Sequence, residues 1–343
     1  MIKPIQIGKH IIGNGRTFII AELGYNFNTL DEAFSSIDAL AQTGADAIKF
    51  QTFRAETITS QKTFFPSQAG SANQFEEFKQ YELSQEQHVA LFKRAMENGL
   101  LPFSTPSYFD DVDLLEELGV HVYKIGSDDL TNLPFLDYVA RKGKPMIIST
   151  GMSYIGEVDA AVRTIHETGN KHLVVLHCTS NYPLTDYANT NLRAVLSMRD
   201  VFKVLVGYSD HSQEDFTSLA AVSLGACVIE KHFTLSRDIP APDCAFSYQP
   251  NDMARLVKTI RNLEAALGDG LKKPAPSEKE MRQETRKSVI AKRDIEIGEA
   301  IGEKDFIVKR PGTGISPALS HIVPGRKARQ RIEADTPITW AHL

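Results

Sequence analysis

The sequence has few cysteines, no long hydrophobic run and no excess of positive charge, and each absence excludes a class of protein. Its three cysteines among 343 residues, Cys178, Cys227 and Cys244, form no C-x-x-C pair, so neither a disulfide framework nor a zinc knuckle is expected. No apolar run reaches the roughly 20 residues that span a bilayer. The net charge of −5 offers no overall attraction for nucleic acid. These features predict a cytoplasmic protein that binds neither membranes nor nucleic acid.

Eight short apolar runs recur along the chain, and segments with helical periodicity separate them. Runs without apolar–polar alternation are typical of parallel strands buried on both faces. Several helical segments begin with a capping residue, as at Thr29, Ser84 and Ser212. Alternating strands and helices predict a (β/α)₈ barrel, and a doubly wound sheet is disfavoured because no G-x-G-x-x-G follows the first strand. The runs are TFIIAELG, DAIKFQTF, LLPFSTP, VYKIGSDD, PMIISTG, HLVVLHCTS, KVLVGYSD and CVIEKHF.

The composition changes after the segment 250–270, which has the pattern of a closing amphipathic helix. A polar, charged and Pro-bearing stretch follows, and the last part of the chain contains short apolar runs separated by Gly and Pro turns. We therefore predict a barrel domain over residues 1–268, a linker over 269–285 and a small, mostly β domain over 286–343.

Polar residues close nearly all of the predicted strands. In a (β/α)₈ barrel the carboxyl ends of the strands converge on one mouth, where the active site lies. We therefore expect one pocket to be lined by Glu22, Lys49, Thr105, Lys124, Ser127, Ser149, His177, Ser209, His211, Glu230 and His232.

His211 and His232 end two adjacent strands, and each has a carboxylate nearby, Asp210 and Glu230 respectively. A lone histidine is more often structural, but two at neighbouring strand ends favour a divalent metal site. Two imidazoles without thiolates predict an open site of the Lewis-acid type.

A lysine at the end of a buried strand is costly unless an anion meets it. Lys49 and Lys124, together with the hydroxyl residues of the mouth, favour a phosphate or carboxylate ligand. Internal salt bridges and a Schiff-base role remain open alternatives for the two lysines. Glu22 is compatible with a general base, a partner of metal-bound water, or a salt bridge.

The motifs IIAELGYN, GADAIKFQTF, FSTP, YKIGS, ISTGM, LHCTSNYP, GYSDHS, IEKHFTL, PAPD and VKRPGTGIS occur in this order along nearly the whole chain. Together they resemble the sialic acid synthase family, and the tail is similar to that family's antifreeze-like SAF domain. The resemblance implies a metal-dependent condensation of phosphoenolpyruvate with an N-acyl-mannosamine-type sugar, which gives a nine-carbon 2-keto acid and phosphate. The expected acceptor is N-acetylmannosamine, and the expected product is N-acetylneuraminate.

The same resemblance assigns roles to individual residues. His211 and His232 would bind Mn²⁺, Mg²⁺ or another divalent ion, and Glu22 would position or deprotonate the attacking water. Glu230 would support the phosphoenolpyruvate-binding residues, Tyr182 and Asp243 would contact the sugar, and Arg310 would enter the partner's barrel in a domain-swapped homodimer. The phosphoenolpyruvate-binding positions would be Lys49, Thr105, Lys124, Ser127, Ser149, Ser180 and Ser209.

The sequence departs from the family pattern at a few positions. Phe27 and Thr29 stand where many members have His and Gly, and Ala241 stands where Gly is usual; Asn73 aligns loosely with a sugar-contacting Asn. Alternative functions are a legionaminic or pseudaminic acid synthase that uses a 2,4-diacetamido-trideoxy sugar, a synthase that uses a 6-phosphorylated sugar, a Schiff-base aldolase, and a non-catalytic binding protein.

Overall fold

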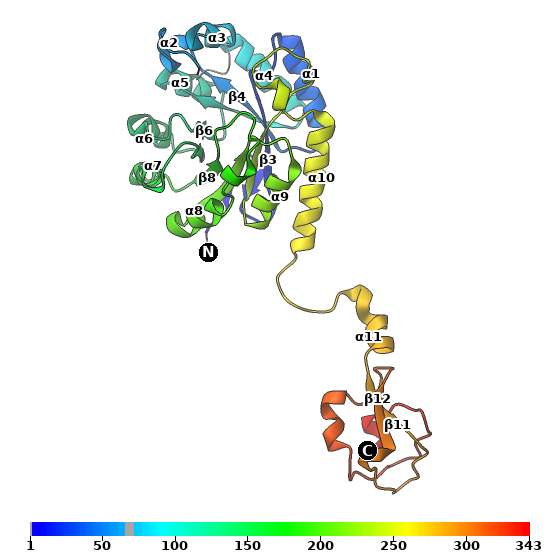
Figure 1. The fold of residues 1–343 in the computed structure, drawn as a ribbon. Helices are drawn as coiled ribbons and strands as arrows, with labels where there is room; N and C mark the ends of the chain where they lie inside the picture. Colours follow the sequence, from blue (N-terminus) through cyan, green and yellow to red (C-terminus); the bar gives the residue numbers. More distant parts are fainter. Residues whose placement is uncertain (1, 66–71) are drawn as a thin grey trace. The chain divides into compact units, whose positions relative to one another are not determined.

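The eight predicted strands form one parallel sheet that curves into a near-closed barrel (Figure 1). The computed structural model describes residues 2–65 and 72–343. Hydrogen bonds join the strands in the order β5–β4–β3–β10–β9–β8–β7–β6, and β5 lies beside β6. Each strand falls within the run predicted for it, which confirms the barrel. The strands are β3 (Phe18–Gly24), β4 (Ala47–Thr52), β5 (Leu101–Pro106), β6 (Tyr123–Ile125), β7 (Met146–Ser149), β8 (Leu173–Cys178), β9 (Leu205–Asp210) and β10 (Val228–His232).

Helices connect the strands and cover the outside of the barrel (Figure 1). Thr29 and Ser84 form capping boxes at the helix starts predicted for them. Ser212 does not cap α9, because its hydroxyl donates to the Glu214 carbonyl; α9 follows Glu214 instead. The helices are α1 (Leu30–Ala41), α2 (Ala55–Ile58), α3 (Gln74–Gln80), α4 (Gln85–Glu97), α5 (Phe109–Glu117), α6 (Leu133–Arg141), α7 (Ile155–Glu167), α8 (Ala194–Phe202), α9 (Asp215–Ser223) and α10 (Pro250–Leu267).

Two apolar cores follow from the alternation of side chains along the strands. One core lies between the sheet and the helices and contains Ile19 and Ile48. The other fills the barrel interior and contains Ile20 and Phe103. It is continuous with the hairpin of β1 (Ile5–Ile7) and β2 (His10–Ile12), which precedes the first barrel strand. The interior is therefore apolar towards the amino ends of the strands, and polar groups gather at their carboxyl ends.

A second compact unit follows the barrel, and the division falls between Gly268 and Asp269. It contains a two-stranded antiparallel sheet of β11 (Ser288–Ala291) and β12 (Phe306–Lys309), around a small core of its own. The predicted linker is partly helical, because α11 (Lys279–Thr285) forms within it. In neither unit does any helix of the described chain have the length and apolar character needed to cross a membrane.

Gly207 allows the inner face of β9 to pack closely, and it should therefore be intolerant of any side chain. A Cβ at this position would lie 2.6 Å from the Val228 carbonyl oxygen and 2.5 Å from a Leu176 methyl group. We expect Gly207→Ala to lower the free energy of unfolding by about 2 kcal/mol, as overpacked core positions do. The measurement is urea denaturation of the intact protein.

Gly156 provides the matched control, since it lies in α7 with no atom within 4 Å of an added Cβ. Gly156→Ala should leave stability unchanged or raise it by about 0.5–1 kcal/mol through helix propensity. Equal effects of the two substitutions would contradict the close-packing argument.

Candidate active site

Four charged side chains meet inside the barrel mouth, and all four are buried. Lys49 on β4 forms an ion pair with Glu22 on β3, and its Nζ lies 3.9 Å from a carboxylate oxygen of Glu230 on β10. Lys124 on β6 places its Nζ 3.7 Å from the other Glu230 oxygen. The strands that carry these residues surround the barrel interior, so two cations and two anions compensate one another there.

The two lysines differ in how firmly they hold their proton. Burial alone would lower the pKa of Lys49, but Glu22 and Glu230 together raise it above its ordinary value. Burial lowers the pKa of Lys124, and the attraction of Glu230 opposes this only in part. Burial raises the pKa of Glu22. Burial would also raise the pKa of Glu230, but the positive charges of Lys124 and Lys49 outweigh this effect and lower it. The two carboxylates thus favour the protonated form of Lys49, which disfavours the Schiff-base role for it.

Hydroxyl groups surround this charged cluster at hydrogen-bond distance. Lys49 Nζ donates to Thr105 Oγ1 at 3.1 Å, and Lys124 Nζ donates to Ser149 Oγ at 2.7 Å. The Ser209 hydroxyl donates to Glu230 at 3.0 Å. The structure thus brings together the predicted lysines, carboxylates and these three hydroxyl residues.

Ser127 and Ser180 place two further hydroxyls around the backbone of Gly151. The Gly151 amide donates to Ser127 Oγ at 3.0 Å. A Cβ on Gly151 would lie 2.2 Å from Ser180 Oγ and 2.8 Å from Ser127 Oγ, so glycine is required for the approach. Ser180 Oγ is buried without a hydrogen-bond partner among the described residues. An unpaired buried hydroxyl suits the oxygens of a phosphate or carboxylate.

The two predicted metal-ligating histidines lie side by side, with ring centroids 5.3 Å apart. His211 Nδ1 lies 2.8 Å from the Thr179 carbonyl oxygen and donates to it, which leaves Nε2 as the nitrogen available to a ligand. His232 Nδ1 is buried and has no hydrogen-bond partner in the described chain. Burial, reinforced by nearby His211, Lys49, Lys231 and Lys124, holds the pKa of His232 well below its ordinary value.

This pair fits an open divalent-metal site. A neutral imidazole is the metal-binding form of histidine, and His232 Nδ1 makes no hydrogen bond in the described chain, with the Asp243 carboxylate 3.5 Å away. No cluster of three or more His, Cys, Asp or Glu side chains with metal-binding geometry occurs in residues 2–65 and 72–343. The protein would therefore supply only two imidazoles, and water or substrate oxygen would supply the rest.

An aromatic wall and a carboxylate adjoin the histidines. The Tyr182 ring lies over His211 at a centroid distance of 4.1 Å and is 53% exposed, and the Phe246 ring lies 5.3 Å from His232. Asp243 lies 3.5 Å from His232 Nδ1, and burial beside Glu22 raises its pKa to about 7. The structure thus places Tyr182 and Asp243 at the same site as the histidines.

Several residues lie elsewhere than the sequence predicted. Asp210 points to the outside of the barrel and pairs with Lys231 at 3.0 Å, because it alternates with Ser209 and His211. His177 also faces outward, with its Nε2 2.6 Å from the Thr190 carbonyl oxygen. Asn73 caps α3 and donates to the Gln61 carbonyl, so its side chain is committed locally.

Other side chains were not anticipated as parts of the site. Gln51 donates to Glu22 at 2.9 Å, and its position two residues after Lys49 could have indicated this. Phe246 ends a short 3-10 helix, Cys244–Phe246, and Gly151 lies in a turn, and the strand pattern predicts neither. Phe27 packs into the apolar core between the sheet and the helices. In the second unit, Arg310 is exposed and follows β12 directly.

A parallel (β/α)₈ barrel with a charged, hydroxyl-lined pocket at the carboxyl ends of its strands is the architecture of an enzyme active site. The NeuB family model matches residues 36–272, and the SAF domain model matches residues 286–343. The chain therefore belongs to the NeuB family and carries a SAF domain after its barrel.

Named relatives and a solved structure cover most of the chain. It is 41% identical to the N,N'-diacetyllegionaminic acid synthase of Legionella pneumophila, over 95% of this chain and 94% of that protein. It is 33% identical to the N-acetylneuraminate-9-phosphate synthase of Mus musculus, over 96% and 94%. The crystal structure of the N-acetylneuraminic acid synthetase of Leptospira borgpetersenii, in complex with citrate, matches with a TM-score of 0.75 and 31% identity, over 82% of this chain and 95% of that one. The family-level expectation from the sequence is confirmed.

The buried pair of Lys49 and Glu22 leads to a prediction about stability. Lys49→Met should lower the free energy of unfolding by about 3–5 kcal/mol at pH 7.5, because it leaves a carboxylate buried without its cation. Adding Glu22→Gln should restore about half of this loss. Urea denaturation of the single and double variants provides the measurement.

The same variant should show a defined pH dependence. Burial raises the pKa of Glu22 above the value in the unfolded chain, and losing Lys49 raises it further. The folded state then binds a proton more tightly, so the penalty of Lys49→Met should shrink as the pH falls from 7.5 to 5. A penalty that is independent of pH, with no restoration by Glu22→Gln, would show that the pair is not coupled.

Proposed function

We propose that this protein condenses phosphoenolpyruvate with the open-chain aldehyde of an N-acyl amino sugar. The nucleophilic C3 of phosphoenolpyruvate forms a bond to the aldehyde carbon, water adds to C2, and loss of phosphate leaves a 2-keto acid with three more carbons. The observation that carries the proposal is the meeting of two buried lysines and a ring of hydroxyls with an imidazole pair in one mouth.

Phosphoenolpyruvate carries a phosphate and a carboxylate, and the deeper part of the mouth offers donors for both. Lys49, Lys124 and the hydroxyls of Thr105, Ser149 and Ser209 lie within one connected network. The hydroxyls around Gly151 extend it, and the unpaired Ser180 Oγ supports their use by a ligand. We assign the anion to this network, with Glu230 keeping both lysines in place.

The sugar would lie above this network, against the imidazoles and the aromatic wall. A divalent ion such as Mn²⁺, held by His211 and His232, would polarise the aldehyde and make it a better electrophile. Tyr182 offers an apolar face to the sugar, and Asp243 accepts hydrogen bonds from its hydroxyls. Glu22, held by Lys49 and Gln51, would orient the water that adds to C2.

The identity of the acceptor separates two candidates. N-acetylmannosamine is one, and a 2,4-diacetamido-trideoxy sugar is the other. The second candidate is supported by the 41% identity to an N,N'-diacetyllegionaminic acid synthase, compared with 33% to an N-acetylneuraminate-9-phosphate synthase.

Phosphate release from phosphoenolpyruvate with a panel of acceptors tests the reaction, the acceptor and the metal together. The panel contains N-acetylmannosamine, its 6-phosphate, and the 2,4-diacetamido-trideoxy sugars that lead to legionaminic and pseudaminic acids, each with and without Mn²⁺. We expect release with an unphosphorylated acceptor only when metal is present, and a loss of at least about 100-fold in His232→Ala. Borohydride trapping of pyruvate on Lys124, without phosphate release from any acceptor, would support an aldolase instead.

The exposed Arg310 leads to a proposal about the second unit. We propose that it completes the site of a partner subunit in a domain-swapped homodimer, where its guanidinium contacts the acceptor. Arg310→Ala and Glu22→Ala should each be inactive as homodimers, and mixing them should recover roughly a quarter of the activity, because one in four sites of a randomised mixture has both intact residues. The absence of recovery in verified mixed dimers would refute the shared site.

A further inference from the structure

A second buried charge cluster lies directly behind the imidazole pair, on the outer face of the same two strands. Asp210 and Lys231 are register partners on β9 and β10, and each is the residue immediately before a histidine of the site. Both side chains are buried, and their charged atoms lie 3.0 Å apart. Because neighbouring residues of a strand face opposite sides, this pair faces outward where His211 and His232 face the mouth.

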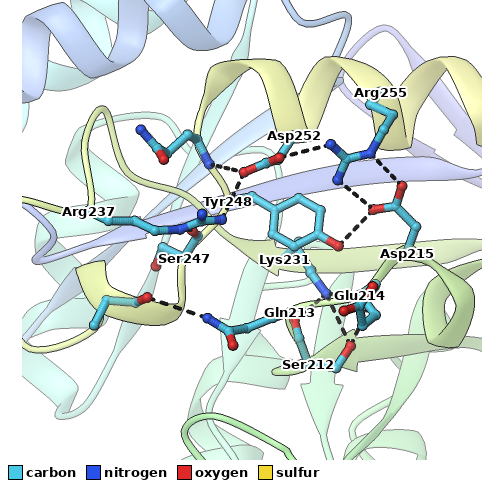
Figure 2. Close-up of polar contacts among 12 residues, drawn as sticks. Ser212, Gln213, Glu214, Asp215, Lys231, Arg237, Ser247, Tyr248, Asp252 and Arg255 are labelled. Atoms are coloured by element: carbon cyan, nitrogen blue, oxygen red, sulfur yellow. Dashed lines mark hydrogen bonds and ion pairs between the residues drawn. The ribbon is translucent and has the colours of Figure 1, made fainter.

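The Lys231 ammonium binds the segment that follows His211. It donates to the Ser212 carbonyl oxygen at 2.6 Å and lies 3.4 Å from the Glu214 carbonyl oxygen. The ring of Tyr248 covers its other side, 4.3 Å from Nζ, as Figure 2 shows. Lys231, the residue before His232, is therefore bonded through its ammonium group to the turn that follows His211.

The Asp210 carboxylate is held as firmly as its partner. It accepts hydrogen bonds from the Ser212 amide at 2.9 Å and from the hydroxyls of Thr217 and Ser218 at 2.8 and 2.6 Å. Both hydroxyls belong to α9, so the carboxylate ties the end of β9 to this helix. A buried ion pair contributes little net stability, but it fixes geometry when each charge is fully hydrogen-bonded.

The outer part of the network ends at the exposed side chain of Arg255 and provides a natural comparison. Tyr248 donates to Asp215 at 2.8 Å, and Arg255 on α10 pairs with Asp215 and with Asp252 at 2.9 Å (Figure 2). The Tyr248 amide donates to the His232 carbonyl at 2.9 Å, whereas the Arg255 guanidinium bonds to Asp215 and Asp252 and joins α9 to α10 away from both histidines.

We infer that Lys231 is a positioning residue, which sets the separation and orientation of His211 and His232 and so determines the affinity of the site for its divalent ion. This inference rests on the proposed function of the two histidines. Lys231 contacts no group of the mouth; it acts on Ser212 and Glu214 from behind, and its effect reaches the metal through the backbone of His211. Two residues of the phosphoenolpyruvate network, Ser209 and Glu230, directly precede Asp210 and Lys231 on the same strands. In the described chain, however, the hydrogen bonds of Lys231 reach the turn after His211 and not the side chains of that network, whose lysines lie on β4 and β6.

The test compares two binding affinities in the intact protein. Lys231→Met keeps the length of the side chain and removes its charge. We expect Mn²⁺ binding, measured with Mn²⁺ alone by the electron paramagnetic resonance signal of the free ion, to weaken about 10- to 100-fold. The dissociation constant of phosphoenolpyruvate, measured by calorimetry without metal, should change much less, by no more than about threefold, because Lys231 bonds to the turn after His211 and not to the side chains of the anion network.

Arg255→Met is the matched control. It breaks the outer ion pairs and should lower the melting temperature while leaving Mn²⁺ affinity unchanged. The inference would be overturned if Lys231→Met bound Mn²⁺ as tightly as the wild type, or if it bound Mn²⁺ and phosphoenolpyruvate with equally reduced affinity. It would also be overturned if Arg255→Met lost as much Mn²⁺ affinity as Lys231→Met.

Two further outcomes are also decisive. If Lys231→Met does not fold, Ser218→Ala takes its place, because it removes one donor from Asp210; we expect a smaller loss of Mn²⁺ affinity, and no loss would overturn the inference. If the wild-type protein binds phosphoenolpyruvate but no divalent ion, the metal assignment of the proposed function fails, and the positioning role fails with it. A wild type that binds Mn²⁺ alongside an unaffected Lys231→Met would refute only the positioning role.

Discussion

Compensation of buried charge is the constraint on which the barrel mouth depends. Lys49, Lys124, Glu22 and Glu230 are all removed from water, and each would be costly without its partners. The barrel makes this arrangement possible because strands from opposite parts of the sequence present their inward residues to one small volume. The ion pairs alone do not satisfy all the hydrogen-bonding groups of these charged side chains. The hydroxyls of Thr105, Ser149 and Ser209 form hydrogen bonds to Lys49, Lys124 and Glu230 respectively. The same network is therefore a structural requirement, and under the proposed function it would also be a preformed receptor for an anionic substrate.

Strand alternation gives β9 and β10 two separate functions. Their inward residues, Ser209, His211, Glu230 and His232, form the mouth, whereas the outward pair of Asp210 and Lys231 anchors the strand ends to α9 and its preceding turn. Under the proposed function, the imidazole pair on these two strands would have to be held from behind, because its inward face is left free for metal and substrate. The outward ion pair meets this need without occupying any space in the mouth.

The strands and most of the mouth could be predicted because they follow from local patterns. Continuous apolar runs ending in Lys, Glu, Ser or His indicate buried strands, and barrel geometry then places those last residues together. It was harder to predict whether a residue next to the end of a strand faces the mouth or the outside of the barrel. Asp210 was expected beside the metal and lies behind it, because the sequence alone does not show where a strand ends and alternation stops. Phe246 and the Ser127–Gly151–Ser180 arrangement depend on loop conformation, which no period in the sequence encodes. Helix α11 was missed because charged residues and prolines mask its short helical stretch.

Apolar side chains fill the barrel towards the amino ends of its strands and are continuous with the β1–β2 hairpin. The mouth is therefore open at one end only. Glu230 and Ser209 precede His232 and His211 by two residues, so they occupy a lower tier than the imidazoles. A ligand on the lower tier has to bind before a second ligand occupies the upper tier. It can dissociate only after the second ligand has left. Under the proposed function, the anion would therefore bind first and the sugar would then cover it.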